Sequence, residues 1–168
     1  MHESSFPEII TFVEKYLDRD SKSSIIDLNG LSARDKNCSL VFDEKNWKYK
    51  LVSLKKNGLD KIENNSADVV VTGQNLERIK FFWRTMEEIG RVLKPRGYFC
   101  AVVASAGVYG TDGDLYRFHP DGLKVLAEIA GLKVLECKMD KTSSWWNTTI
   151  IAQKPGRKPK TKKPIAEE

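Results

Sequence analysis

The segment from residue 66 to residue 99 constrains the fold more than any other part of the chain. Asp68 opens a short apolar run at 69–71 that does not alternate with polar residues, which is typical of a parallel strand covered on both faces. The Lys-Pro-Arg-Gly sequence at 94–97 ends the helix that follows, and a second strand is predicted at 98–104. Apolar spacings of three and four predict one buried helical stripe: Leu76, Ile79, Phe82, Trp83, Met86, Ile89, Val92 and Leu93.

Strand and helix patterns alternate through the rest of the chain as well. No clear third strand is visible, because only the polar stretch 55–66 separates the second strand from the strand at 68–72. The predicted fold class is α/β: a Rossmann-like, doubly wound, mainly parallel sheet of about six strands, lacking the third strand and ending in an antiparallel strand. The remaining predicted elements are helices at 6–17 and 120–130 and strands at 24–28, 47–54 (or 39–42), 132–138 and 145–153.

The positive charge is concentrated at the C-terminal end of the sequence. The chain has 168 residues and a formal net charge of +5. Residues 154–168 hold six Lys or Arg and two Glu, a net of +4, which leaves +1 for residues 1–153. We expect one domain over 1–153 and a basic, disordered tail over 154–168, since the tail has too few apolar residues to offset its ordering entropy. A specific nucleic-acid role is not expected, because the sequence of the body offers no basic face.

The sequence does not favour a membrane protein, a disulfide-stabilised protein or a metal-binding protein. The longest apolar runs are strand-length, far short of the ~20 residues that a membrane span requires, and the first residues lack the plan of a signal peptide. Cys38, Cys100 and Cys137 are odd in number, and none are spaced as C-x-x-C, so neither a disulfide framework nor a zinc site is expected. A soluble cytoplasmic protein with no metal site is the expectation.

Two segments resemble a known family. The sequence DVVVTGQNLERIKFFWRTMEEIGRVLKPRGYF at 68–99 closely resembles the region from the fourth to the fifth strand of class I S-adenosylmethionine-dependent methyltransferases. The likeness is greatest to small methyltransferase-domain proteins associated with glycan biosynthesis, and residues 113–136 resemble their cluster of Asp, aromatic, Arg and Phe. The resemblance implies S-adenosylmethionine as cofactor and methyl transfer to an oxygen or nitrogen of a small-molecule or glycan acceptor.

The end of the first strand is the first candidate cofactor site. In open α/β sheets, ligands bind outside the carboxyl ends of the strands. Asp27, Asn29 and Gly30 follow this strand, where the resemblance implies that an acid orients the methionine moiety. Asn29 and Gly30 tolerate positive φ and can form a tight turn, although the family usually has more glycines here. An ordinary turn after a strand is the competing interpretation.

The exit of the strand at 68–72 supplies the next candidates. Gly73 and Gln74 are expected at the mouth of the cofactor cleft. Asn75 follows them and is a candidate N-cap for the helix.

The second strand should end in an acid that accepts hydrogen bonds from both ribose hydroxyls. The resemblance aligns this position with Ser53, whose hydroxyl carries no charge and predicts weaker cofactor binding. If the strand ends at Phe42 instead, Asp43 or Glu44 supplies the acid. Asp60 is the only substitute for the acid of the missing third strand, and a solvated loop is the simpler interpretation there.

The acceptor side is expected after the strand at 98–104. Asp114, Tyr116 and Arg117 are the candidate catalytic residues, since they can orient a hydroxylated acceptor or take its proton. The similar proteins often carry His where Tyr109 and Arg78 stand in this chain. Methyl transfer depends above all on alignment, so an absent base does not exclude activity.

The departures from the family pattern leave a second function open. A methyltransferase-like fold that has lost catalysis and serves as a binding or regulatory subunit agrees with the thinned glycine motif and with Ser53. Trp145 and Trp146, at the start of the last strand, would favour a homodimer or another partner if they are exposed at a sheet edge.

Overall fold

The computed structural model describes residues 5–29, 38–39, 41–43, 45–54, 58–107, 113–142 and 146–156. Several residues singled out by the sequence lie outside these ranges: Gly30, Glu44, Tyr109, Trp145 and the tail from 157 onward.

The described part of the chain forms one six-stranded sheet in the order β2-β1-β3-β4-β6-β5. The first four strands in this order are parallel to one another, and β6 runs antiparallel to both β4 and β5. This topology confirms the predicted Rossmann-like α/β fold with its antiparallel last strand. The strands are β1 (Ser23–Asn29), β2 (Trp47–Ser53), β3 (Ala67–Gly73), β4 (Leu93–Ala106), β5 (Lys133–Asp140) and β6 (Trp146–Gln153).

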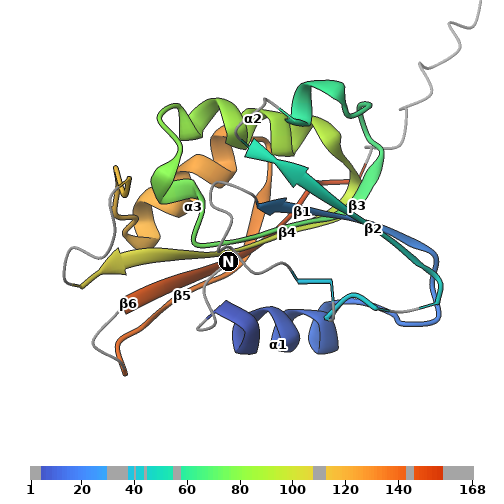
Figure 1. Ribbon diagram of the computed structural model, residues 1–168, viewed down its shortest axis with the longest axis horizontal. Coiled ribbons are helices and arrows are strands. Elements are labelled where there is room, and N and C mark those ends of the chain that lie inside the picture. The colour runs from blue at the N-terminus through green and yellow to red at the C-terminus, as the bar shows by residue number, and fades with distance from the viewer. Residues whose placement is uncertain are drawn as a thin grey trace, which may run out of the picture.

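Helices cover both faces of the sheet. In Figure 1, α1 (Phe6–Tyr16) lies below the sheet, while α2 (Phe82–Val92) and α3 (Pro120–Ile129) lie above it. Successive strand residues point to opposite faces, so Ile25 packs in the core under α1 and Ile26 packs in the core under α2 and α3. This two-sided burial explains why the strands lack an alternating pattern.

The helix predicted from Leu76 begins later than expected. Residues Leu76–Arg78 form a 3-10 turn, η4, after which Ile79 is extended, and α2 starts at Phe82. A helix that starts there buries Met86, Ile89 and Val92, as predicted. Trp83 lies about 100° around the axis from Phe82 and is 41% exposed, so its assignment to the core was wrong.

The segment between β2 and β3 contains no strand among its described residues. It forms a short 3-10 turn, η3 (Gly58–Lys61), in which Asp60 is exposed. Arg91 on α2 holds this segment in place by donating hydrogen bonds to the carbonyls of Leu59 (2.8 Å) and Ile62 (2.7 Å). In the described residues, the turn η3, which is held by Arg91, therefore stands where a third strand would lie, and β2 is an edge of the described sheet.

The other edge of the sheet is β5. Trp146 at the start of β6 is 38% exposed, and the Nζ of Lys141 lies 5.3 Å from the centre of its ring. The last strand itself is not an edge, because β6 lies between β4 and β5, so the expectation of a pairing edge at this strand was wrong. A homodimer stays a prediction.

We predict that Gly90→Ala destabilises the protein although alanine is the better helix former. A Cβ at this position of α2 would lie 2.1 Å from the backbone oxygen of Ala130, just after α3. The two helices must separate to admit it, at a cost of about 1–3 kcal/mol. Gly122→Ala in α3 is the matched control: no atom lies within 4 Å of its added Cβ, and it should stabilise by about 0.4–1 kcal/mol. Urea unfolding of both variants measures the difference, and a neutral Gly90→Ala would contradict the packing.

Candidate functional site

The carboxyl ends of the parallel strands meet at one edge of the sheet. β1 ends at Asn29 and β2 at Ser53, and the register pairs these two residues directly. β3 ends at Gly73, on the other side of β1. The chain thus reverses its strand order between β1 and β3, which is where open α/β sheets bind their ligands. Three of the predicted cofactor residues are brought together at this point.

The same register decides which residue ends the second strand. Ser53 occupies that position, as the resemblance indicated. Asp43 precedes β2 and is exposed, and Phe42 packs beside Trp47 and Tyr49 instead of ending a strand. The alternative in which Asp43 supplies the ribose acid is therefore not supported, because the strand begins after it.

Asp27 is a buried carboxylate two residues before the end of β1. Its Oδ2 accepts hydrogen bonds from the hydroxyl of Tyr49 (2.5 Å) and the backbone N–H of Cys38 (2.8 Å). Its Oδ1 is buried and has no partner among the described residues. Burial raises the pKa of Asp27, against the effect of these two hydrogen bonds. Asp27 thus ties β1 to β2 and to the point where the chain returns at Cys38.

The exit of β3 is fixed by side chains that bind the backbone of β1. Thr72 Oγ1 and Asn75 Nδ2 both donate to the carbonyl of Leu28, at 3.0 and 3.2 Å. Asn75 makes no capping hydrogen bond, so its predicted role as a helix cap was wrong. Its amide is drawn toward the strand instead, and it also donates to the carbonyl of Gly73 at 2.9 Å.

Gln74 points away from the predicted cofactor residues. Its backbone has a φ of 51°, in the left-handed region that non-glycine residues rarely adopt. Its Nε2 donates to Oδ1 of Asn147 on β6 at 3.0 Å. The side chain therefore lies on the β6 side of the edge, across β3 and β4 from Asn29 and Ser53.

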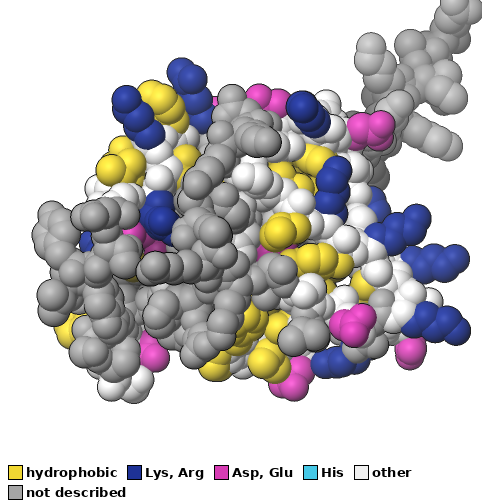
Figure 2. All heavy atoms as spheres, viewed as in Figure 1, with side chains coloured by type: hydrophobic (Ala, Val, Ile, Leu, Met, Phe, Trp, Pro, Cys, Tyr) yellow, Lys and Arg dark blue, Asp and Glu magenta, His cyan; other side chains and the backbone are white. Residues whose placement is uncertain are grey.

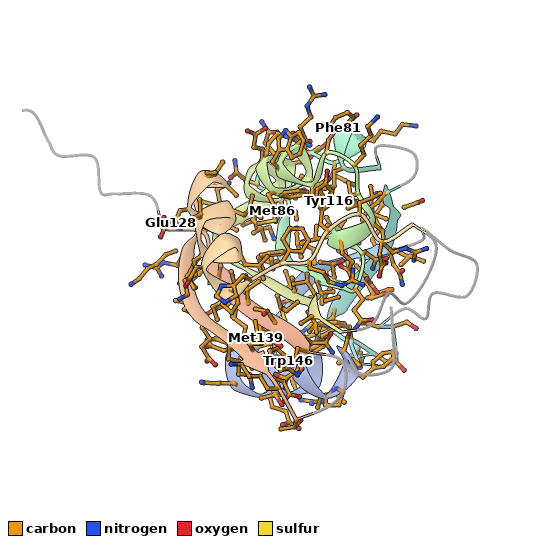
Figure 3. The ribbon with its side chains drawn as sticks, turned by 90° about the vertical axis from the view of Figure 1, so that its left-hand side faces the viewer. Phe81, Met86, Tyr116, Glu128, Met139 and Trp146 are labelled. Atoms are coloured by element: carbon orange, nitrogen blue, oxygen red, sulfur yellow. The ribbon has the colours of Figure 1, made fainter. Side chains whose placement is uncertain are left out.

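The predicted acceptor residues divide into a charged pair and a packed ring. Arg117 Nη2 lies 3.0 Å from Oδ2 of Asp114, and both side chains are mostly buried. The hydroxyl of Tyr116 donates to the carbonyl of Lys80 at 3.0 Å, and its ring packs edge-on against Phe82. Figure 3 shows Tyr116 next to Met86 and below Phe81. Asp114 and Arg117 form the charged pair, and their role toward an acceptor stays a prediction.

Glu77 is a candidate that the sequence did not reveal. It is 2% exposed, and its backbone carbonyl accepts from the N–H groups of Leu115 (2.8 Å) and Tyr116 (3.0 Å). Its Oε2 is buried without a partner among the described residues. Burial raises the pKa of Glu77 to about 7; the charge of Asp114 adds to this shift and that of Arg117 opposes it. In a continuous helix Glu77 would fall on the polar face, so only the break before Phe82 turns it inward.

A family model for a methyltransferase domain matches residues 24–101, which run from β1 into β4. The resemblance to class I S-adenosylmethionine-dependent methyltransferases is confirmed. The match indicates S-adenosylmethionine as the cofactor of such a domain. The narrower resemblance to glycan-biosynthesis proteins stays a prediction. No curated protein is a significant sequence match to the chain.

Solved structures of low sequence identity share the fold of this methyltransferase-like chain. An S-adenosylmethionine-dependent methyltransferase from Methanosarcina mazei is 15% identical, with a TM-score of 0.65 over 87% of this chain and 98% of that one. The 1,6-didemethyltoxoflavin-N1-methyltransferase of Burkholderia thailandensis is 13% identical, with a TM-score of 0.69 over 91% and 79%. The [4+2]-cyclase SpnF is 15% identical, with a TM-score of 0.64 over 92% and 83%. The last shows that this fold also supports other chemistry.

The described ranges of the chain offer neither a membrane-spanning helix nor a metal cluster. No helix there is long and apolar enough to cross a membrane. No group of three or more His, Cys, Asp or Glu side chains there is arranged to hold a metal ion.

We predict that Glu77 makes the fold less stable as pH rises. Its pKa is raised from 4.5 to about 7, so its contribution is fully present below about pH 4.5 and is lost as pH rises to about 7. The loss amounts to about 3 kcal/mol at most. Glu77→Gln, which cannot ionise, should therefore gain stability over the wild type at pH 8 but not at pH 4.5. Urea midpoints at the two pH values test this.

Glu87→Gln on the exposed side of α2 is the control for that experiment, because its carboxyl is already in water. It should shift stability equally at both pH values. If Glu77→Gln behaves like Glu87→Gln, Glu77 is not held in the protonated form.

Proposed function

We propose that this chain is an S-adenosylmethionine-dependent methyltransferase that acts on an oxygen or nitrogen of a small or sugar-like acceptor. The observation that carries the proposal is the meeting of Asp27, Asn29 and Ser53 at the point where the strand order reverses, within a region that matches a methyltransferase domain. Family and fold support methyl transfer, and the acceptor is inferred from the side chains near the edge.

The residues present fit the amino-acid end of the cofactor. The buried Oδ1 of Asp27 lacks a donor among the described residues, and an ammonium group provides donors together with the opposite charge. Asn29 is buried at the end of the same strand, beside the position of Gly30. Asp27 and Asn29 would therefore hold the methionine moiety.

The fit to the ribose is weaker. Ser53 offers a hydroxyl where a carboxylate could accept two hydrogen bonds. Neither Asp43 nor Asp60 ends a strand at this edge, since the first precedes β2 and the second lies exposed in η3. We expect the chain to bind S-adenosylmethionine less tightly than an otherwise similar protein would with an acidic residue in place of Ser53.

The acceptor would be held by the charged pair beyond β4. Arg117 carries a fixed positive charge that can bind an acceptor oxygen, and Asp114 can accept a hydrogen bond from its hydroxyl. The bound cofactor would supply an electrophilic methyl group, which forms a bond to the acceptor oxygen or nitrogen as its bond to sulfur breaks. The acceptor proton can pass to Asp114 or to water. Glu77 senses the charges of both Asp114 and Arg117, and its pKa of about 7 would let it hold a proton near this pair.

We predict measurable binding of S-adenosylmethionine that two substitutions move in opposite directions. Asp27→Asn keeps the shape of the side chain but loses its charge, and should weaken binding about tenfold or more. Ser53→Asp restores an acid next to Asn29 and should tighten binding by about tenfold. Isothermal titration calorimetry with S-adenosylmethionine measures both effects, and circular dichroism checks that each variant is folded.

Asn46→Asp is the matched control for Ser53→Asp. It adds the same charge beside β2, but just before the strand's first residue instead of at its last. It should leave cofactor binding unchanged.

The second candidate function is a binding or regulatory subunit that retains the fold without catalysis. Ser53 and the absence of a third strand between β2 and β3 in the described residues favour it. A folded wild-type protein that gives no heat with millimolar S-adenosylmethionine, and whose Ser53→Asp variant gives none either, would decide for this function against the proposed enzyme.

A further inference from the structure

Two adjoining grooves lie at the opposite edge of the sheet, at the amino ends of the parallel strands. Their volumes are about 370 and 460 Å³. Both are lined by Ser24, Lys48 and Ser66, so they form one continuous depression. We call this depression the lysine groove, after the side chains that line it: Lys22, Lys45, Lys48, Lys50, Lys61 and Lys94.

The charge of the lysine groove is strongly one-sided. Only two carboxylates line it, Glu63 and Asp68. Asp68 is neutralised by Lys94, whose Nζ lies 2.7 Å from its Oδ2, and it also accepts from the N–H of Ser24 at 2.8 Å. None of the other five lysines forms an ion pair with a described residue. Figure 2 shows Lys and Arg side chains gathered along the right-hand side of the molecule, where β1 and β2 begin.

The walls of the groove are held by contacts to the core. Arg91 on α2 fixes the turn that carries Lys61, by its hydrogen bonds to the carbonyls of Leu59 and Ile62 and to Oδ1 of Asn64. Lys48 and Lys50 project from β2, which is paired with β1 along its whole length. The lysines are therefore displayed by fixed elements on more than one side of the depression.

The basic C-terminal segment leaves the fold beside this groove. Lys154 donates from its Nζ to Oδ1 of Asn65 at 2.9 Å, next to the groove residue Ser66. Its backbone carbonyl accepts from the N–H of Arg96, near the start of β4. Beyond residue 156 the sequence continues with five more Lys or Arg. The lysine groove and Lys154 thus lie close together, although residues 1–153 carry a net charge of only +1.

We propose that the lysine groove binds the phosphodiester backbone of a nucleic acid without reading its sequence. Lysine is a point charge that suits phosphate contacts but lacks the bidentate fork by which arginine reads guanine. Two aromatic residues line the groove: Trp47 is only 7% exposed, and Tyr49 packs its ring against Phe42 and donates its hydroxyl to Asp27, so stacking on bases is not favoured. None of the exposed large apolar side chains lines the groove, so a membrane surface is not favoured.

This site is distinct from the proposed methyltransferase site. It lies at the amino ends of the strands, whereas Asp27, Asn29 and Ser53 lie toward their carboxyl ends. The sequence did not indicate this cluster, because the lysines are dispersed in sequence and gathered only by the fold. A bound nucleic acid would tether the chain without entering the catalytic edge.

The test is fluorescence anisotropy of the full chain with labelled 20-nucleotide oligouridine and oligoadenosine over a series of salt concentrations. We expect equal affinity for both and a steep loss of binding with salt. Changing Lys22, Lys45, Lys48 and Lys61 to Gln should lower the slope of log K against log [salt] by about 2 to 3 and weaken binding at 0.1 M salt about 100-fold or more. Calorimetry with S-adenosylmethionine should be unchanged in this variant.

The matched control removes the same charge elsewhere. Changing Lys124, Lys133, Lys138 and Lys141 to Gln alters α3, β5 and the residue after β5, away from the groove, and should reduce the slope by less than 1. The proposal is overturned if the two variants lose binding equally, if oligouridine and oligoadenosine differ more than tenfold, or if the wild type binds anionic phosphatidylglycerol vesicles but not the oligonucleotides.

Discussion

The carboxylate of Asp27 must find partners inside the sheet, and the carboxyl edge is arranged around that requirement. A buried carboxylate without hydrogen bonds costs several kcal/mol, whereas Tyr49 and the N–H of Cys38 each donate to this one. The first bond fixes β2 beside β1, and the second fixes where the chain returns after its exit from β1. Because β1 is the strand between β2 and β3, the pairing of Asn29 with Ser53 depends on the same interaction.

Local patterns were sufficient to predict most of the fold. The apolar runs of β3 and β4 and the stripe of α2 follow from periodicity, and the described residues of the polar stretch before β3 form a 3-10 turn and no strand. Trp83 was assigned wrongly, and Glu77 was not identified, because the chain breaks between η4 and α2 and both side chains are shifted relative to a continuous helix. The break depends on how Leu76 and Asn75 anchor to the sheet, and no local pattern reports such contacts.

The candidate site was only partly predictable, for a related reason. Asp27, Asn29 and Ser53 could be named from strand ends, but their proximity depends on the register between β1 and β2. Gln74 was placed at the cleft mouth by its position, yet its amide turns to Asn147, a residue distant in sequence. The lysine groove is the extreme case, since its six lysines come from four separate segments and only the fold brings them to one edge.

The departures from the methyltransferase pattern fall on one side of the site. Ser53 and the missing third strand both concern the side of β2, where the adenosine half of the cofactor would lie. Asp27 and Asn29, on the methionine side, retain groups that can bind. An acceptor such as Oδ1 of Asp27 costs a fold about 1–3 kcal/mol if it is buried with no donor. The two hydrogen bonds to Oδ2 account for the structural role of this carboxylate, and they leave Oδ1 unsatisfied among the described residues. A cationic ligand would satisfy it, so we propose that the amino-acid end of the cofactor lies there.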